Sequence, residues 1–156
     1  MKTKLVMTGL LAAVGLAAGD AMADDRLPLE RIDQILTHGS AFGYQHYKEL
    51  EAKSSDSVEI EGWMDDEWFA EARLSIESGD SLKENRERLI TGAWGMSEEE
   101  VRQAFEVAAG EGMVSFEEIK IDEKGMIEIE GENDQGQELE VKVRQGDSAV
   151  ASVERD

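Results

Sequence analysis

Val58-Glu59-Ile60-Glu61-Gly62 occurs again, further along the chain, as Ile127-Glu128-Ile129-Glu130-Gly131. Both copies alternate apolar and acidic residues and end at glycine, which is typical of a half-buried strand that runs into a turn. The shift that brings Val58 onto Ile127, which we call the repeat offset, aligns the chain without a gap from Leu27 to Leu74. We therefore interpret most of the chain as one small module that is used twice.

The first copy combines a helix pattern with strand patterns. Leu29, Ile32, Ile35 and Leu36 are spaced as one apolar face of a helix, and His38-Gly39 is the predicted stop. Strand patterns follow over residues 44–53, 58–64 and 68–76.

The second copy repeats this order. Ser97 and Glu100 have the spacing of a capping box, which predicts the start of a helix that ends near Gly110. Strand patterns follow over residues 116–122, 127–131 and 139–143, and residues 149–154 are a candidate fourth strand.

These patterns predict an α+β fold of two tandem modules. Each module is expected to have one helix packed on one face of a three- to four-stranded antiparallel sheet, with glutamates on the other face. The expected boundaries are a signal peptide at 1–23, a first module at 24–76, a linker at 77–95 and a second module at 96–156. Within the linker, a helical turn around residues 82–90 is one option.

The N-terminus has the organisation of a secretory signal peptide. Lys2 and Lys4 precede an uncharged apolar run from Leu5 to Gly19, and Ala21-Met22-Ala23 is an A-x-A cleavage motif. The run is shorter than the roughly 20 residues of a membrane-spanning helix, so we expect cleavage rather than anchoring. The expected product is a periplasmic or secreted protein without a membrane anchor.

Composition restricts the partners. The 156 residues include 36 acidic and 16 basic ones, for a net charge of -20, and no cysteine. Such a surface repels nucleic acids and anionic lipids, whereas a basic protein, cations or a saline habitat would suit it. The lack of cysteine excludes disulfides and thiolate chemistry.

The second copy resembles a PepSY domain, the small module of peptidase propeptides and many exported bacterial proteins. The resemblance is carried by Met96 to Val101, Glu118 to Asp122, Ile127 to Glu130 and Asp134 to Val141, and the first copy matches more loosely. The closing Asp-Pro-x-Thr-Gly turn of the family is missing. The resemblance implies a non-enzymatic module that inhibits or regulates a peptidase, with no catalytic residues to transfer. The expected tandem architecture is also similar to that of the exported beta-lactamase inhibitor protein, whose sheets form a concave protein-binding face.

The candidate partner-binding residues lie on the expected outward faces of the sheets. Trp63 and Phe69 are aromatic residues on an otherwise acidic face and are candidate anchors for a partner, unless they pair with each other across the hairpin or are covered by another part of the chain. The acidic candidates are Glu59, Glu61, Glu71, Glu128, Glu130 and Glu140. Met64 and Trp68 are expected to point inward.

No catalytic constellation, cofactor site or metal site is predicted. His38 and His46 are the two histidines, and neither has convergent ligands in the sequence. The glycines at 125 and 136 do not fit a calcium loop and are assigned to hairpin turns. The leading expectation is a protein that binds an exported or envelope protein, such as a peptidase. The alternative is an acidic periplasmic protein that binds cations through surface charge.

Overall fold

The computed structural model describes residues 25–156, and the predicted signal peptide lies outside these described residues. The elements in chain order are β1 (Leu27–Pro28), the 3-10 turn η2 (Leu29–Arg31), α1 (Ile32–Phe42), β2 (His46–Ser54), β3 (Ser57–Trp63), β4 (Trp68–Ser75), β5 (Ser81–Arg88), α2 (Glu98–Gly110), β6 (Met113–Ile121), β7 (Met126–Asn133), β8 (Glu138–Arg144) and β9 (Val150–Arg155). Neither helix of the described residues is long and apolar enough to cross a membrane.

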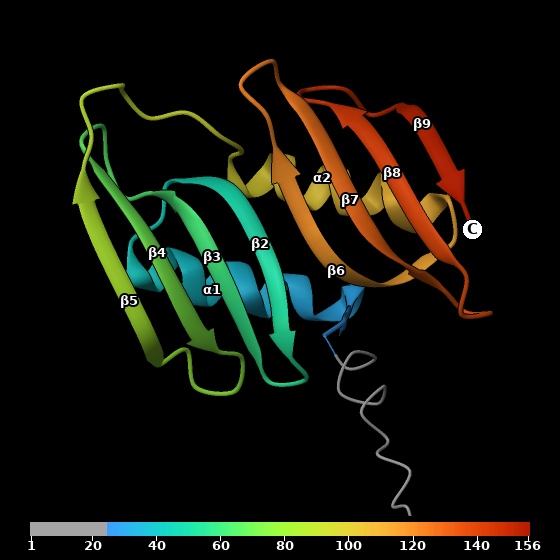
Figure 1. Cartoon of the computed structure of the whole chain (residues 1–156), viewed down its shortest axis with the longest axis horizontal. Coiled ribbons are helices and arrows are strands. Elements are labelled where there is room, and N and C mark those ends of the chain that lie inside the picture. The colour runs from blue at the N-terminus through green and yellow to red at the C-terminus, as the bar shows by residue number, and fades with distance from the viewer. Residues whose placement is uncertain (1–24) are drawn as a thin grey trace, which may run out of the picture.

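All strands belong to one antiparallel sheet. Its order is β5-β4-β3-β2-β6-β7-β8-β9, and the short strand β1 pairs with β6 beside this path. Figure 1 shows both helices behind the same face of this sheet. Helix α1 lies behind strands β5, β4, β3 and β2, and α2 lies behind β6, β7, β8 and β9. The prediction of two separate helix-on-sheet modules is therefore wrong, because a single nine-stranded sheet spans both halves of the chain.

The two halves join at the edges that separate modules would have left free. Strands β2 and β6 pair antiparallel, with Leu50 opposite Ile119 and Glu51 opposite Glu118. A free edge exposes a row of unpaired N–H and C=O groups. Pairing β2 with β6 satisfies these groups and buries both Leu50 and Ile119 completely, which is the physical reason for one sheet.

The join has an approximate two-fold symmetry. Leu50 and Ile119 occupy equivalent positions of the repeat, and the neighbouring pairs exchange equivalent positions: Glu49 pairs with Lys120, and Glu51 with Glu118. The segments before the helices follow the same rule, since Leu27 pairs with Phe116 and Met96 with Tyr47. Each half thus contributes a short extended segment to the sheet of the other half.

The apolar face of the sheet and the apolar faces of the helices form one core. Ile35 and Leu36 of α1 and Val101 of α2 are buried in the same cluster as Ile60 and Ile129. A salt bridge of 2.8 Å between Arg102 Nε and Asp33 Oδ1 links the two helices on this side. The opposite face of the sheet, which we call the outer face, carries the charged residues of the alternating strands.

The first helix passes the stop that the sequence predicted at Gly39. It continues to Phe42, and Gly39 is buried inside it. A Cβ atom at position 39 would lie 2.6 Å from the Tyr47 hydroxyl oxygen. Gly39 therefore serves the close packing of β2 on α1 rather than ending the helix.

Two further local features differ from the sequence interpretation. Residues 81–88, which we expected to lie in a linker with a helical turn as one option, form the edge strand β5, whose residues are all exposed. Gly62 and Gly131 do not begin turns but lie within β3 and β7.

Candidate functional site: the acidic outer face

The outer face of the six central strands is dominated by glutamates. Nine of them alternate with buried apolar residues, and we call these the outer-face glutamates: Glu49 and Glu51 on β2, Glu59 and Glu61 on β3, Glu71 on β4, Glu118 on β6, Glu128 and Glu130 on β7, and Glu140 on β8. All nine are half-buried, because neighbouring strands bring them side by side. The six glutamates that the sequence singled out are among them.

Lysines neutralise most, but not all, of these carboxylates. Lys48 pairs with Glu61 at 3.1 Å, Lys53 with Glu51 at 2.8 Å, and Lys120 with Glu118 at 2.8 Å. Glu59, Glu71, Glu128 and Glu140 also have a lysine within 3.8 Å. Within residues 25–156, only Glu49 and Glu130 of the nine lack an ion pair.

Trp63 and Phe69 do lie next to each other, but Trp63 is not presented to a partner. The two rings are an opposed pair of β3 and β4 and meet edge to face with centroids 5.4 Å apart. Trp63 is only 1% exposed, and the ammonium group of Lys48 lies 5.7 Å from the centre of the Phe69 ring. The alternative that the aromatic residues pair across the hairpin is the arrangement observed.

Trp68 keeps the strand phase of the inward residues Ala70 and Ala72 but is not buried. It is the first residue of β4, lies opposite Arg88 of the edge strand, and has 43% of its surface exposed. The edge strand is too polar to bury it. Met64, by contrast, packs against the core as expected.

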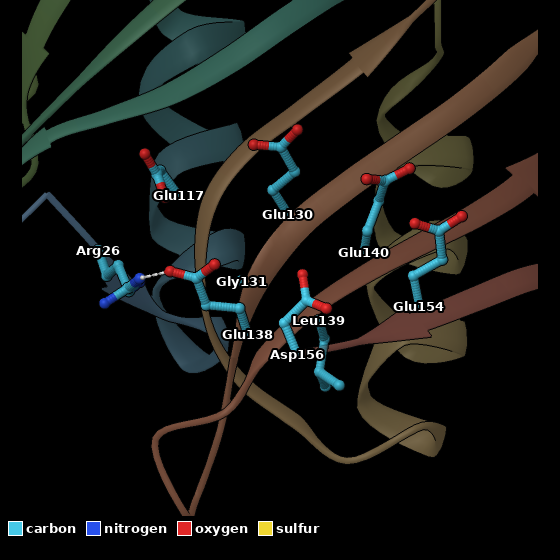
Figure 2. A pocket seen from close by; sticks show the side chains of 9 residues that line it. All are labelled: Arg26, Glu117, Glu130, Gly131, Glu138, Leu139, Glu140, Glu154 and Asp156. Atoms are coloured by element: carbon cyan, nitrogen blue, oxygen red, sulfur yellow. Dashed lines mark hydrogen bonds and ion pairs between the residues drawn. The ribbon is translucent and has the colours of Figure 1, made fainter.

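The second half of the outer face contains an acidic depression of about 220 Å³. Figure 2 shows the carboxylates of Glu117, Glu130, Glu140 and Glu154 projecting from neighbouring strands around it. The other lining residues are Arg26, Gly131, Glu138, Leu139 and Asp156. Six of the nine lining residues are therefore acidic.

Among residues 25–156, Arg26 is the one cation that lines the depression. Its Nη1 lies 2.8 Å from Glu132 Oε2, and its Nη2 lies 3.4 Å from Glu138 Oε1. These pairs fasten the segment before β1 to the β7–β8 hairpin. They leave Glu130 without a cation.

The depression arises where the two halves differ. Lys48, which pairs with Glu61 in the first half, corresponds by the repeat offset to Glu117, beside Glu130. Trp63 and Phe69 correspond to Glu132 and Glu138. The first half therefore has a lysine and an aromatic pair where the second half has three carboxylates.

The pKa of Glu130 reflects its burial among other carboxylates. Desolvation by burial raises the pKa of Glu130, and the carboxylates of Glu118 and Glu128 add to the effect, while Lys120 opposes it. Ligand oxygens of Glu128, Glu130 and Glu140 all lie within 4.8 Å of one another. This arrangement favours a positively charged ligand, because a cation would relieve the mutual repulsion.

The histidines lie away from this cluster. His38 Nε2 is 2.8 Å from the carbonyl oxygen of Ile76, and this contact ties α1 to the residue that follows β4. His46 is opposite Trp63 in the sheet. Neither has the convergent acidic ligands of a metal site among the described residues.

The site residues that the sequence analysis missed are Glu49, Glu118, Glu117 and Arg26. Glu49 and Glu118 were missed because both strands that carry them were assigned only by their apolar residues. The exchange of Lys48 for Glu117 was visible in the aligned copies, since it reverses a charge at one repeat position. Arg26 could not be placed, because its neighbours come from the other half of the chain.

The comparisons with known proteins give little. No protein-family model and no curated protein matches the chain. A similar solved structure is that of a "putative lipoprotein" from Clostridium difficile, with 19% identity over 83% of this chain and 93% of that chain and a TM-score of 0.49. The resemblance to PepSY domains thus stays a prediction.

Proposed function

We propose that the protein is an exported, non-catalytic binding protein whose acidic outer face binds a cationic segment of another protein. The observation that carries this proposal is the unpaired Glu130 in a depression lined by Glu117 and Glu140. In the first half, the equivalent Glu61 has a lysine ammonium 3.1 Å away. A lysine or arginine of a partner would supply the same contact to Glu130.

Charge complementarity of this kind governs the rate of association more than the final affinity. A face with nine glutamates attracts a basic partner over a distance of about a Debye length, and the attraction weakens with salt. The depression adds a local site in which the ammonium group loses part of its water and meets several carboxylates. The protein would then select basic side chains rather than cations in general.

The proposal is tested by titrating the protein with a short lysine-rich peptide and with its fully acetylated form. We expect binding of the first peptide only, weakening as the salt concentration rises. The decisive variant is Glu117→Lys, which restores at the depression the lysine that the first half has at position 48. It should abolish most of the binding, because the new ammonium group occupies the place of the partner's.

Glu123→Lys is the matched control. It makes the same change of charge at an exposed turn residue outside the outer face, so it should weaken binding only slightly. Equal losses for both variants would show a general charge effect without a site and would contradict the proposal.

Export and the choice of partner are proposed from the sequence. Residues 1–23 support export, because they have the organisation of a cleavable signal peptide. The PepSY resemblance supports a peptidase of the cell envelope as the partner. Affinity capture from an envelope extract with the wild-type protein and the Glu117→Lys variant tests this choice, because a specific partner should be lost from the variant.

Cation binding is the second candidate function. The observation in its favour is the group formed by Glu128, Glu130 and Glu140. Against it, Lys142 lies 2.6 Å from Glu140 and Lys120 lies 3.5 Å from Glu128, so two of the three carboxylates are already paired. Calorimetry with calcium distinguishes the two functions: a binding heat that disappears in Glu130→Gln would favour the cation.

A further inference from the structure

A pair of acidic residues stands at the centre of the outer face, where the two halves meet. Glu49 on β2 and Glu118 on β6 are equivalent by the repeat offset and flank the central pair of Leu50 and Ile119. Both strands have a register irregularity at the same place, between Tyr47 and Glu49 in β2 and between Phe116 and Glu118 in β6. The register places Glu49 opposite Lys120 and Glu118 opposite Glu51, so the two equivalent glutamates are diagonal neighbours on the outer face.

The charged groups around Glu49 come from three strands. Its cross-strand partners are Glu61 on β3 and Lys120 on β6, and Glu51 follows on its own strand. The helices lie behind the other face of the sheet (Figure 1).

The lysines in this region are engaged by other carboxylates. Lys48 Nζ is 3.1 Å from Glu61 Oε2, and Lys120 Nζ is 2.8 Å from Glu118 Oε2. The hydrogen bond to Glu118 is also the main cause that raises the pKa of Lys120. A proton between Glu49 and Glu118 therefore belongs on Glu49, because Glu118 already has a cation.

Diagonal neighbours on adjacent strands lie within reach of each other's long side chains, and a hydrogen bond between two carboxyl groups requires that they share a proton. Two ionised carboxylates cannot hydrogen-bond to each other, whereas a carboxylic acid can donate to a carboxylate. Burial, the hydrogen bond with Glu118 and the charges of Glu118, Glu61 and Glu51 together raise the pKa of Glu49 to about 7.

We propose that Glu49 and Glu118 share one proton at the centre of the outer face and that loss of this proton strengthens the binding of a cationic partner. The second part rests on the function proposed above. At acidic pH the Glu49 carboxylic acid donates to Glu118, and the pair has one negative charge. At alkaline pH both groups are ionised, and the outer face gains a negative charge at its centre.

The first experiment follows the carboxyl groups of the glutamates by carbon-13 NMR during a pH titration of the full chain. One signal, absent from Glu49→Gln, should titrate near neutral pH. In Glu118→Gln the same signal should move to the ordinary range of glutamate, because an amide N–H replaces the shared proton. A Glu49 signal that titrates near 4.5 in the wild-type protein would overturn the proposal.

The second experiment measures the binding of the lysine-rich peptide at pH 6 and pH 8. We expect about two- to fivefold tighter binding at pH 8, the size of effect that one added charge on a solvent-facing surface produces. Glu49→Gln should show no such gain from this pair, since its amide donates to Glu118 at every pH.

Glu71→Gln is the matched control, because it removes a charge from the same face on β4, two strands away from β2. It should keep most of the pH dependence of peptide binding. A near-neutral Glu49 titration without any peptide binding would support the proton pair and contradict the proposed function. Peptide binding with the same pH dependence in wild type and Glu49→Gln would contradict the regulatory role of the pair.

Discussion

At the scale of single residues, Gly62 and Gly131 show why the repeated phrase ends in glycine. Both lie on the inner face of a strand, and a Cβ atom at Gly62 would overlap the carbonyl oxygen of His46, while one at Gly131 would overlap that of Ser115. His46 and Ser115 are also equivalent positions of the repeat. The glycines therefore permit the close approach of the neighbouring bulged strand, twice, in the same way.

Gly62→Ala should for this reason be strongly destabilising. The overlapping atom belongs to the backbone of β2 and cannot move aside cheaply, so we expect a loss of about 1–3 kcal/mol or more in the free energy of unfolding. Urea denaturation measures it. Gly110→Ala is the control, because a Cβ atom there has open space and helix propensity favours alanine. A Gly62→Ala variant as stable as the wild type would contradict the packing argument.

The proton pair also has a consequence for stability. The pKa of Glu49 is raised to about 7 in the folded protein, whereas an exposed glutamate has one near 4.5. Between these values the folded state binds more protons than the unfolded state, so stability falls as pH rises through this window. The contribution is fully present below pH 4.5 and lost above pH 7.

The effect is measured by comparing the free energy of unfolding of the wild type and of Glu49→Gln, from denaturation curves at pH 5 and pH 8. Glu49→Gln should be more stable than the wild type at pH 8 and should lose less stability between the two pH values. The opposite order at pH 8 would show that the ionised Glu49 is stabilised by its surroundings.

At the scale of elements, the two helices begin differently although the halves are repeats. The start of α2 has a complete capping box, in which Ser97 Oγ accepts from the Glu100 N–H at 3.1 Å and Glu100 Oε1 accepts from the Ser97 N–H at 3.1 Å. The first half enters its helix through Pro28 and the turn η2 without a side-chain cap.

Ser97→Ala should lower the free energy of unfolding by about 1 kcal/mol, the usual cost of removing an N-cap. Ser97→Asp should restore most of the loss, since a carboxylate also accepts from the amide groups at the helix start. Chemical denaturation of the three proteins checks this. Equal stability of wild type and Ser97→Ala would mean that the packing of α2 on the sheet alone fixes its start.

The same scale shows how far sequence patterns can predict the elements. Alternation in Val58 to Glu61 and Ile127 to Glu130 predicted strands and placed the glutamates on one face, because each strand buries one side. Strand β5 could not be predicted in this way: its sequence from Ser81 to Arg88 is charged on both sides, and all of its residues are exposed. It is a strand only because the edge of β4 offers it hydrogen-bond partners.

At the scale of the whole molecule, the sequence did not predict how the halves combine. An apolar residue such as Leu50 has the same position in the pattern whether its strand ends a small sheet or joins two halves. The pairing of Leu50 with Ile119 decides between these two cases, and it depends on contacts between residues that are far apart in the sequence. The acidic depression is equally hidden, because it needs Arg26 and Asp156 from opposite ends of the described chain.

The continuous sheet predicts that the two halves unfold together. Their core is one cluster of buried residues, and each half includes a paired segment of the other. The three tryptophans, Trp63, Trp68 and Trp94, all precede the second helix, so their fluorescence reports mainly on the first half. Ile129→Ala, in the second half, should nevertheless shift the midpoint of the tryptophan transition, since it should cost about 2–5 kcal/mol of the stability that both halves share.

Val114→Ala is the control for this experiment, because Val114 belongs to β6 in the same half but is 47% exposed. It should leave the midpoint almost unchanged. Circular dichroism, which follows the strands of both halves, should give the same midpoint as fluorescence for each protein. Two separate transitions, or a tryptophan transition that ignores Ile129→Ala, would show that the halves fold independently and that the pairing of β2 with β6 adds little to the stability of the sheet.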